Sequence, residues 1–588
     1  MSPENTIPTP ATPDVCTIAV LVDGAEIPGR FQIVALSVSH ELNRIPSAVV
    51  QLLDGEASKS TFEASDEELF VPGKEIEIQL GYRAQNDSVF KGIVIKQSLK
   101  IRKNGSFLSV ECRGKAVKMT RGVKNRYFAD MKDSDVMEEI IGAYNLQSDV
   151  AATTPEPESV VQYESTDWDF LLCRAEANGM VVMAANDSVT VAPPDASAEP
   201  AVTVRYGATV LELDAELDAR VQETGITASA WNPADQEIVE TEAAEPSTTG
   251  NGNLSPSDLA DVLGGEANVI RHGGNLSQPE LQAWADARLT KERLAKVRGR
   301  VRFQGLATIL PGQVIEVTGI GARFEGNLYV SGVRHTVSGG NWETDVQFGL
   351  DPELFPERYN LRPLPASGLL PGVGGLQMGV VTVLEGDPES MERIKVRLPM
   401  ISDADEGVWA RLATLDAGEE RGTFFRPEIG DEVVVGFLGD DPRHPVVLGM
   451  CHSAAKPAPE GASDDNHRKG YVSREKMMLT FDDDKKIIHL ETPGGNKLSL
   501  SDDDNGILVE DMNGNKITLD DNGITIESAS DIVLKATGDI KAEGANIEFS
   551  AQSSFKAEGS ATAELSGTST ELKGSGTTKI SGGIVQIN

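Results

Sequence analysis

Two copies of one short motif lie near the end of the chain, Gly495-Asn-Lys-Leu-Ser-Leu500 and Gly514-Asn-Lys-Ile-Thr-Leu519. A second motif alternates with it, because Asp504-Asn-Gly-Ile507 is repeated as Asp521-Asn-Gly-Ile524. Each copy joins a glycine turn to apolar and polar residues in alternation, which is the pattern of a β-strand. The same strand and turn are written twice, and this predicts a hairpin-like or stacked β-repeat.

Farther on, single apolar side chains recur about every eight residues up to the end of the chain, with glycines between them. They are Ile532, Ile540, Ile547, Phe555, Ala563, Leu572, Ile580 and Ile587. Each unit is then one very short strand plus one turn, and it buries only one or two apolar side chains. That burial is too small to offset an ordering entropy of about 1–2 kcal/mol per residue, so the unit cannot be stable alone.

Three arrangements of this tail are conceivable: a single-chain solenoid, a disordered segment and a needle of three identical chains. Solenoid rungs are usually longer and more apolar, and a disordered composition does not generate a sustained period. Three chains around a threefold axis pair every strand edge and bring each apolar residue against its symmetry mates. We therefore predict a triple-stranded β-helix over residues 476–588, with these residues on its axis: Ile532, Ile540, Ile547, Phe555, Leu572, Ile580 and Ile587.

Residues 376–455, upstream of a short linker at 456–475, read as a compact all-β domain. The expected strands are Met378 to Leu384, Arg393 to Leu398, Val408 to Leu412, Val433 to Leu438 and Val446 to Gly449. Five short strands in about 80 residues are typical of an OB-type barrel. A small β-sandwich fits the same strand count, so the pattern alone leaves both open.

Residues 1–370 read as a β-rich region with a few helices. Alternating runs between Cys16 and Cys112 predict antiparallel strands, and helices are expected from Asp135 to Leu146 and from Trp168 to Ala177. A further helix should begin at Ser277-Gln-Pro-Glu280, which has the form of a capping box.

An acidic stretch at about 214–274 interrupts this region. It is rich in Ala, Ser, Thr, Gly and Pro, as in Glu240-Thr-Glu-Ala-Ala-Glu-Pro-Ser-Thr-Thr-Gly250. Such a composition buries little, and we expect a mobile loop or insertion.

The charge balance excludes some partners. With 53 Lys and Arg against 91 Asp and Glu, the net charge of −38 repels phosphate backbones, so no nucleic-acid partner is expected. The four cysteines are far apart and form no CxxC pair that would indicate metal or redox chemistry. The N-terminus has neither the basic nor the apolar region of a signal peptide, and we expect a cytoplasmic protein before assembly or release.

Few residues offer chemistry. His444 beside Asp440 and Asp441 fits a turn better than an acid–base pair, because no nucleophile motif is near. The runs Asp482-Asp-Asp484 and Asp502-Asp-Asp-Asn505 offer oxygen ligands but lack the Glu that completes a calcium loop. No catalytic residue, metal or cofactor is therefore expected.

Several motifs resemble VgrG proteins and phage central spike proteins. The runs Arg426-Pro-Glu-Ile-Gly-Asp-Glu-Val-Val-Val-Gly-Phe437 and Gly439-Asp-Asp-Pro-Arg-His-Pro-Val-Val-Leu-Gly449 are similar to the OB-domain signature of that family. Glu164-Ser-Thr-Asp-Trp-Asp-Phe-Leu-Leu-Cys-Arg-Ala-Glu-Ala-Asn-Gly179 is similar to a helix motif of its hub domain, and Val89-Phe-Lys-Gly92 and Tyr329-Val-Ser-Gly-Val333 fit hub strands.

The resemblance implies a mainly β architecture of a β-rich hub with a few helices, an OB-fold barrel and a trimeric β-helix needle. It implies a homotrimer that docks on a hexameric inner-tube protein or baseplate component. A PAAR-repeat protein would cap the needle at Ile584, Val585, Gln586, Ile587 and Asn588.

The function expected from the resemblance is a structural, non-enzymatic spike of a contractile injection system. It would contact the target membrane transiently and carry effector cargo. The alternative is a spike that is also an effector hydrolase of the cell wall, with its activity in the acidic stretch or a linker.

Overall fold

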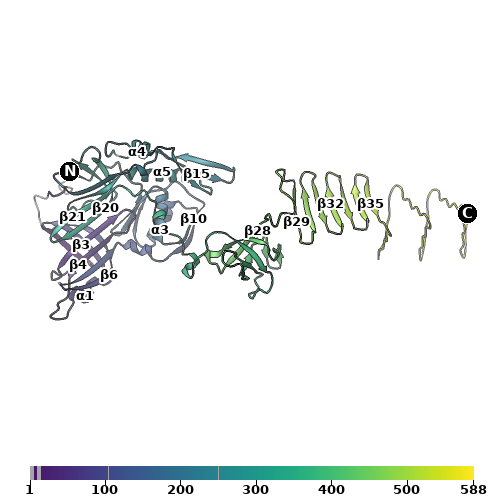
Figure 1. Ribbon diagram of the computed structural model, residues 1–588, viewed down its shortest axis with the longest axis horizontal. Coiled ribbons are helices and arrows are strands. Elements are labelled where there is room, and N and C mark those ends of the chain that lie inside the picture. The colour runs from purple at the N-terminus through teal and green to yellow at the C-terminus, as the bar shows by residue number, and fades with distance from the viewer. Residues whose placement is uncertain (1–5, 10–14, 104, 249, 588) are drawn as a thin grey trace. The chain divides into compact units, whose positions relative to one another are not determined.

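The computed structural model describes residues 6–9, 15–103, 105–248 and 250–587 (Figure 1). By its internal contacts the chain divides into two units. Residues 1–374 with 437–442 form the first, and residues 375–436 with 443–588 form the second.

A thirteen-stranded sheet is the framework of the first unit, the hub. Its main path runs in the order β14-β18-β21-β20-β3-β4-β7-β6-β5-β1-β2, and β13 and β19 branch from β20. The bounds are β1 (Cys16–Val22), β2 (Ala25–Glu26), β3 (Ile33–Glu41), β4 (Ser47–Leu53), β5 (Glu75–Tyr82), β6 (Gln85–Arg102), β7 (Gly105–Arg113), β13 (Val202–Arg205), β14 (Val210–Leu217), β18 (Val297–Gln304), β19 (Val314–Thr318), β20 (Gly326–Ser338) and β21 (Asn341–Phe348). The strands expected between Cys16 and Cys112 are confirmed, and the sheet buries two separate apolar cores.

A helical layer with short strands packs around a third core. It contains β8 (Lys124–Ala129), α2 (Asp133–Gly142), β9 (Gln147–Val150), β10 (Ser159–Ser165), α3 (Asp167–Ala177), β11 (Val181–Ala185) and β12 (Ser188–Ala192). Both expected helices are present. They are joined by Asp133, whose carboxylate accepts hydrogen bonds from Arg174 at 2.6 and 2.7 Å and from Asn178 at 2.8 Å.

The expectation of a mobile loop at 214–274 is wrong for most of that stretch. It contains β15 (Ile226–Asn232), β16 (Glu237–Glu242), α4 (Pro256–Leu263) and β17 (Asn268–His272), and β15 is the middle strand of a three-stranded sheet. This sheet packs on α5 (Gln278–Leu294), whose predicted capping box is present: the Ser277 backbone N–H donates to Glu280 Oε2 at 2.9 Å.

The core under this small sheet explains the error. It is made largely of small side chains, Ala228 and Ala230 of β15 with Leu281 and Ala285 of α5. Alanine contributes little to a measure of apolar content, yet it lets a strand and a helix approach closely. The low apolar content of residues 214–274 therefore gave no indication that β15 packs against α5.

The second unit contains a closed five-stranded barrel in the order β22-β23-β24-β28-β27. Its strands are β22 (Gln377–Val383), β23 (Ile394–Arg397), β24 (Val408–Leu412), β27 (Glu432–Phe437) and β28 (Pro445–Met450). The parallel pairing of β24 with β28 gives the Greek-key order of an OB fold and rules out the sandwich alternative. All five expected strands are confirmed.

Seven further strands form one sheet in strict sequence order. They are β29 (Arg468–Val472), β30 (Met478–Asp482), β31 (Ile487–Glu491), β32 (Lys497–Ser501), β33 (Gly506–Glu510), β34 (Lys516–Asp520) and β35 (Gly523–Glu527), which Figure 1 shows as a ladder of hairpins. The quoted motifs of the repeat lie on β32 to β35. No strand forms within the single chain between Glu527 and the last described residue.

Two buried histidines lie in the hub sheet. His335 is completely enclosed and its Nδ1 lies 3.0 Å from Thr344 Oγ1, while His40 Nε2 lies 2.8 Å from the Val89 carbonyl oxygen. Burial, with a smaller contribution from His40, lowers the pKa of His335 to about 3. Burial also lowers the pKa of His40. Both rings are therefore neutral in the folded protein at neutral pH.

The hub should lose stability as the pH falls below about 6.5. The unfolded chain takes up a proton at His335 there while the folded one does not, so the free energy of unfolding falls with pH down to the folded pKa of about 3. Between pH 7 and 5 this site alone should cost about 2 kcal/mol. Urea unfolding of the full chain, followed by tryptophan fluorescence, should show a smaller pH dependence in His335→Asn. The exposed His467→Asn control should keep the slope, and equal slopes in all three proteins would refute the assignment.

Candidate functional site

The two faces of the β29–β35 sheet differ in chemistry. Strand register places two apolar side chains from each of β30 to β35 on the same face, in two columns that cross the strands. We call this set the apolar face: Leu479, Phe481, Ile488, Leu490, Leu498, Leu500, Ile507, Val509, Ile517, Leu519, Ile524 and Ile526. The columns arise because each strand carries apolar residues at alternate positions and each hairpin keeps the register.

The opposite face is mostly polar along its centre, where Leu508 is an apolar exception, and it is charged at its rim. Ser499 and Thr518 lie near its middle, and Lys497–Glu510 and Lys516–Glu527 are paired across neighbouring strands at 2.8 and 2.6 Å. Within the described part of one chain the apolar face stays largely open to solvent, since Val509 is 43% and Ile526 54% exposed. An apolar surface of this regularity marks a binding interface.

The axis residues predicted farther along are also exposed in the single chain, from 52% for Ile547 to 84% for Ile587. Of the predicted cap-contact residues, Ile584, Val585 and Gln586 are exposed as well, and Asn588 lies outside the described residues. Their roles stay predictions. The eight-residue period does not include the apolar face, whose signal in the sequence is the alternation of apolar and polar residues within each strand.

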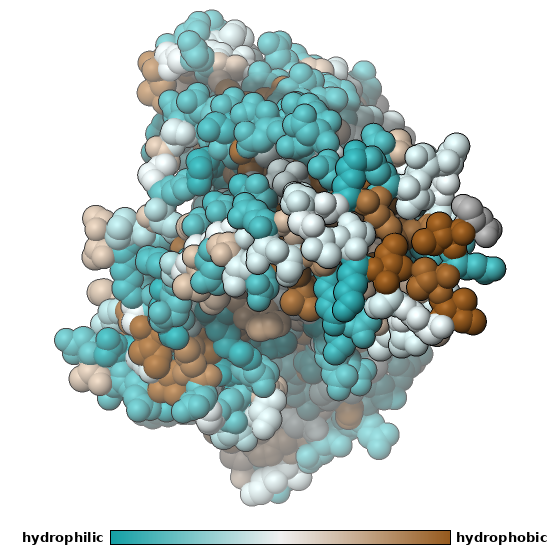
Figure 2. Space-filling view, turned by 90° about the vertical axis from the view of Figure 1, so that its right-hand side faces the viewer, coloured by the Kyte–Doolittle hydropathy of each residue, from teal (hydrophilic) through white to brown (hydrophobic). Residues whose placement is uncertain are grey.

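Figure 2 shows that apolar side chains on the visible surface gather in compact groups among hydrophilic ones. The chain therefore presents discrete apolar areas rather than a uniformly polar surface, as expected of a protein that assembles with others.

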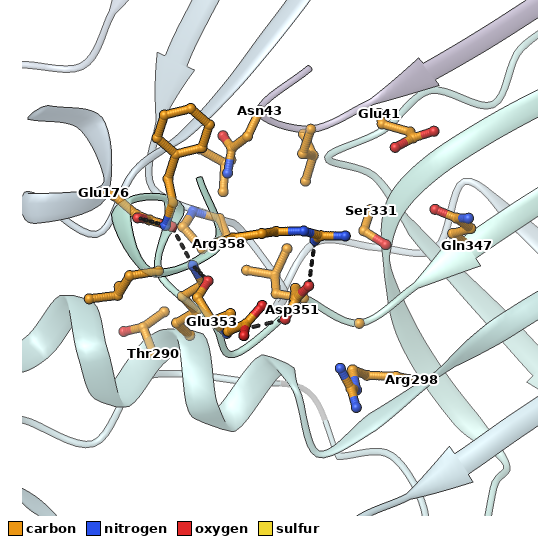
Figure 3. A pocket seen from close by; sticks show the side chains of 18 of the residues that line it. Glu41, Asn43, Glu176, Thr290, Arg298, Ser331, Gln347, Asp351, Glu353 and Arg358 are labelled. Atoms are coloured by element: carbon orange, nitrogen blue, oxygen red, sulfur yellow. Dashed lines mark hydrogen bonds and ion pairs between the residues drawn. The ribbon is translucent and has the colours of Figure 1, made fainter. Parts of the chain in front are cut away.

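A cavity of about 1000 Å³ lies in the hub, between α3, α5 and the ends of β18 and β21 (Figure 3). Charged groups on its wall are engaged in ion pairs. Arg358 donates to Asp351 at 2.6 Å, and Arg300 donates to Asp214 at 2.8 Å. Burial raises the pKa of the lining Cys173 to about 11, so this thiol is protonated and a weak nucleophile at neutral pH.

One side of the cavity is a strap that contains α6 (Phe355–Arg358). Glu176 of α3 holds it: one carboxylate oxygen accepts from the Phe355 backbone N–H at 2.7 Å, and the other accepts from Lys291 of α5. Lys291 also donates to the backbone carbonyl of Glu353. The segment that leads out of the hub is thus fixed to two hub helices.

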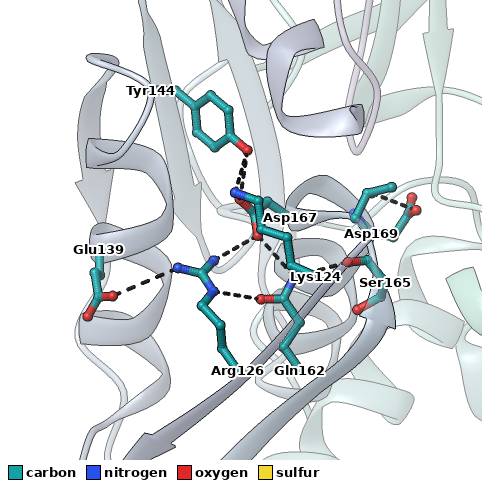
Figure 4. Close-up of polar contacts among 9 residues, drawn as sticks. Lys124, Arg126, Glu139, Tyr144, Gln162, Ser165, Asp167 and Asp169 are labelled. Carbon is teal, nitrogen blue, oxygen red and sulfur yellow. Dashed lines mark hydrogen bonds and ion pairs between the residues drawn. The ribbon is translucent and has the colours of Figure 1, made fainter. Parts of the chain in front are cut away.

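A buried carboxylate organises the helical layer (Figure 4). Asp167, at the first turn of α3, is fully buried, and its two oxygens accept from Lys124 at 2.5 Å, Tyr144 at 2.7 Å, Arg126 at 2.8 Å and Gln162 at 2.9 Å. Burial alone would raise the pKa of Asp167, but these hydrogen bonds and the Arg126 charge outweigh it and hold the pKa below its usual value. The group is a structural anchor whose donors come from β8, β10 and the turn after α2.

Asp504 accepts a hydrogen bond from Ser501 Oγ at 2.9 Å within its own turn. Within the described ranges no cluster of three or more His, Cys, Asp or Glu is arranged to hold a metal ion. No described helix combines the length and apolar content needed to cross a bilayer.

Comparisons with known proteins match three segments. Residues 12–339 match the Alg8 N-terminal domain, residues 377–452 the type VI secretion system/phage-baseplate injector OB domain, and residues 487–588 the phage baseplate V C-terminal trimerisation domain. The barrel and the repeated tail thus each match a domain of baseplate proteins.

Two curated relatives and one solved structure are similar. VgrG1b, a type VI secretion system spike protein of Pseudomonas aeruginosa, is 28% identical over 31% of this chain and 26% of its own length. VgrG3 of Vibrio cholerae is 29% identical over 19% of this chain and 12% of its length. The tail protein from Neisseria meningitidis aligns with a TM-score of 0.43 and 15% identity, over 59% of this chain and 99% of that one.

The matches thus span about a quarter or less of these two curated relatives. The three family models cover most of the hub, the barrel and most of the repeated tail in separate segments. The chain therefore belongs to the family of the Alg8 N-terminal domain and, through its barrel and C-terminal repeat, to the VgrG and phage central spike proteins.

Proposed function

We propose that this protein is the trimeric, non-enzymatic spike at the tip of the inner tube of a contractile injection system. Its hub connects to a hexameric tube protein, its needle receives a PAAR-type cap, and the assembly punctures a target membrane and carries effectors. The observation that carries the proposal is the apolar face of β30–β35, because its strands from β31 onward lie in the region matching a trimerisation domain.

A second and third copy of this chain are the occupants that fit this face. Both columns continue without interruption over six strands, so the partner must offer an equally long, regular apolar surface. An identical sheet offers such a surface, and threefold symmetry lets each copy cover the next. The charged rims then lie at the outside, where the net charge of −38 keeps the assembly soluble.

Light scattering should give the mass of three chains of 62.8 kDa each. Val509→Asp on the apolar face should then raise the concentration at which the trimer dissociates at least tenfold, because each charge must be desolvated against its mates. For a three-chain equilibrium this is a hundredfold change in the dissociation constant, or about 2.7 kcal/mol per trimer. Thr518→Asp on the polar face should leave that concentration nearly unchanged.

The two variants can be told apart because Thr518 is less exposed than Val509 within one chain, so exposure alone would make Thr518→Asp the more damaging change. A chain that works as a monomer would tolerate Val509→Asp at least as well as Thr518→Asp. A monomeric mass at micromolar concentration, or equal behaviour of the two variants, would overturn the proposal.

A further inference from the structure

Two hairpin turns at the same end of the strands in the β29–β35 sheet share one backbone geometry. In the turn after β31, Thr492 N–H donates to the Asn496 carbonyl oxygen at 3.0 Å, and in the turn after β33, Asp511 N–H donates to that of Asn515 at 3.0 Å. Both turns have a glycine of positive φ before the asparagine, +94° at Gly495 and +86° at Gly514. A side chain there would strain the backbone, which explains the repeated Gly-Asn pair.

The side chains of Asn496 and Asn515 each connect their own turn to the segment that follows on the same side of the sheet, and we call each such pair of hydrogen bonds a clip. The Asn496 amide donates to Thr492 Oγ1 of its own turn at 3.1 Å, and its oxygen accepts from the Met512 backbone N–H of the next turn at 3.2 Å. The Asn515 amide likewise donates to Asp511 Oδ2 at 2.8 Å, and its oxygen accepts from the Ala529 backbone N–H at 3.1 Å.

The second clip lies where the regular strands stop. Ser528 Oγ also donates to Asn515 Oδ1 at 2.7 Å, so one carboxamide oxygen holds the two residues that follow β35. The eight-residue apolar repeat begins just beyond, at Ile532. No strand of the single chain continues there, so this contact ties the start of the repeat to the sheet.

We propose that Asn496 and Asn515 are positioning residues that fix the stacking of successive turns, and that Asn515 transfers the register of the sheet to the eight-residue repeat. Both contacts lie within one chain, so the clips form whether or not three chains associate. Only the consequence for the repeat rests on the proposed trimer.

Hydrogen exchange of the full-length chain, resolved to single amides, tests the clips. Asn496→Ala should speed exchange of the Met512 backbone amide about tenfold and leave the Ala529 amide unchanged. Asn515→Ala should speed exchange of the Ala529 amide about tenfold and leave the Met512 amide unchanged. Asn513→Ala is the matched control. Asn513 lies in the same turn and donates to Asp511 Oδ2 at 3.2 Å, so it should alter neither amide.

A rescue separates positioning from a general effect on the turn. Asn515→Asp keeps the oxygen acceptor but sets a second carboxylate against Asp511, so Ala529 should lose protection. Adding Asp511→Thr, which copies the Thr492 turn, removes the repulsion and supplies a hydroxyl donor, and protection at Ala529 should return. If Asn513→Ala matched Asn515→Ala, or the double variant failed to restore protection, the inference would be wrong.

The consequence for the repeat has its own readout. In a trimer, Asn515→Ala should lower the temperature at which the needle dissociates, and Asn513→Ala should not. If the wild-type chain proves monomeric, the proposed function fails, but the exchange pattern still shows whether Asn496 and Asn515 protect the Met512 and Ala529 amides.

Discussion

Ile547→Asp is expected to abolish the heat- and detergent-resistant trimer, whereas Lys541→Asp leaves it nearly intact. If Ile547 lies on the threefold axis, the substitution sets three carboxylates against one another. Desolvation and like-charge repulsion together should then exceed several kcal/mol per trimer. Gel mobility of unheated samples and light scattering across a temperature ramp measure the loss.

The contrast depends on assembly. In the single chain Ile547 is 52% exposed and the Lys541 side chain is 84% exposed. Lys541 Nζ lies 3.2 Å from Asp539 Oδ2. Neither substitution should change the stability of an isolated chain by more than about 0.5 kcal/mol. Equal behaviour of the two variants would therefore reject the predicted register of the repeat.

Asp167→Ala should lower the free energy of unfolding of the hub by about 3–5 kcal/mol, because it leaves Lys124 and Arg126 without their shared counter-charge and Gln162 buried without its acceptor. Because the folded pKa of Asp167 lies below its usual value, the stabilisation is present at neutral pH. It is lost only as the pH falls below about 3.8, through that folded pKa.

Urea unfolding at pH 7 measures this effect. Asp169→Ala is the control, since Asp169 is in the same first turn of α3 but accepts from Thr166 Oγ1 at 2.7 Å rather than from the buried cations. It should cost about 1 kcal/mol or less. A similar loss in both variants would mean that the helix terminus, not the buried ion pair, provides the stability.

The barrel was the part most fully predictable from the sequence. Its strands are short, their apolar residues alternate, and glycine and proline mark the turns, so local pattern and final fold agree. The strand order needed the structure, because the parallel pairing of β24 with β28 joins segments separated by β27.

The Asp167 site could not be derived in the same way. A sequence places Asp167 at a helix start, where an acidic residue is ordinary, and gives no sign that Lys124 and Arg126 face it from β8. Their alternate spacing shows only that they share one face of a strand. The role of such residues depends on which distant residues they contact in the folded chain, and the sequence around each residue does not show those contacts.

The strict sequence order of β29–β35 has a kinetic consequence. Every strand pairs only with its neighbours along the chain, so the sheet has low contact order and closes only short loops. Each newly made chain can therefore complete this sheet before it meets another copy. The apolar face then stays open to solvent until a partner covers it, and the net charge of −38 keeps the unassembled chain soluble in the meantime.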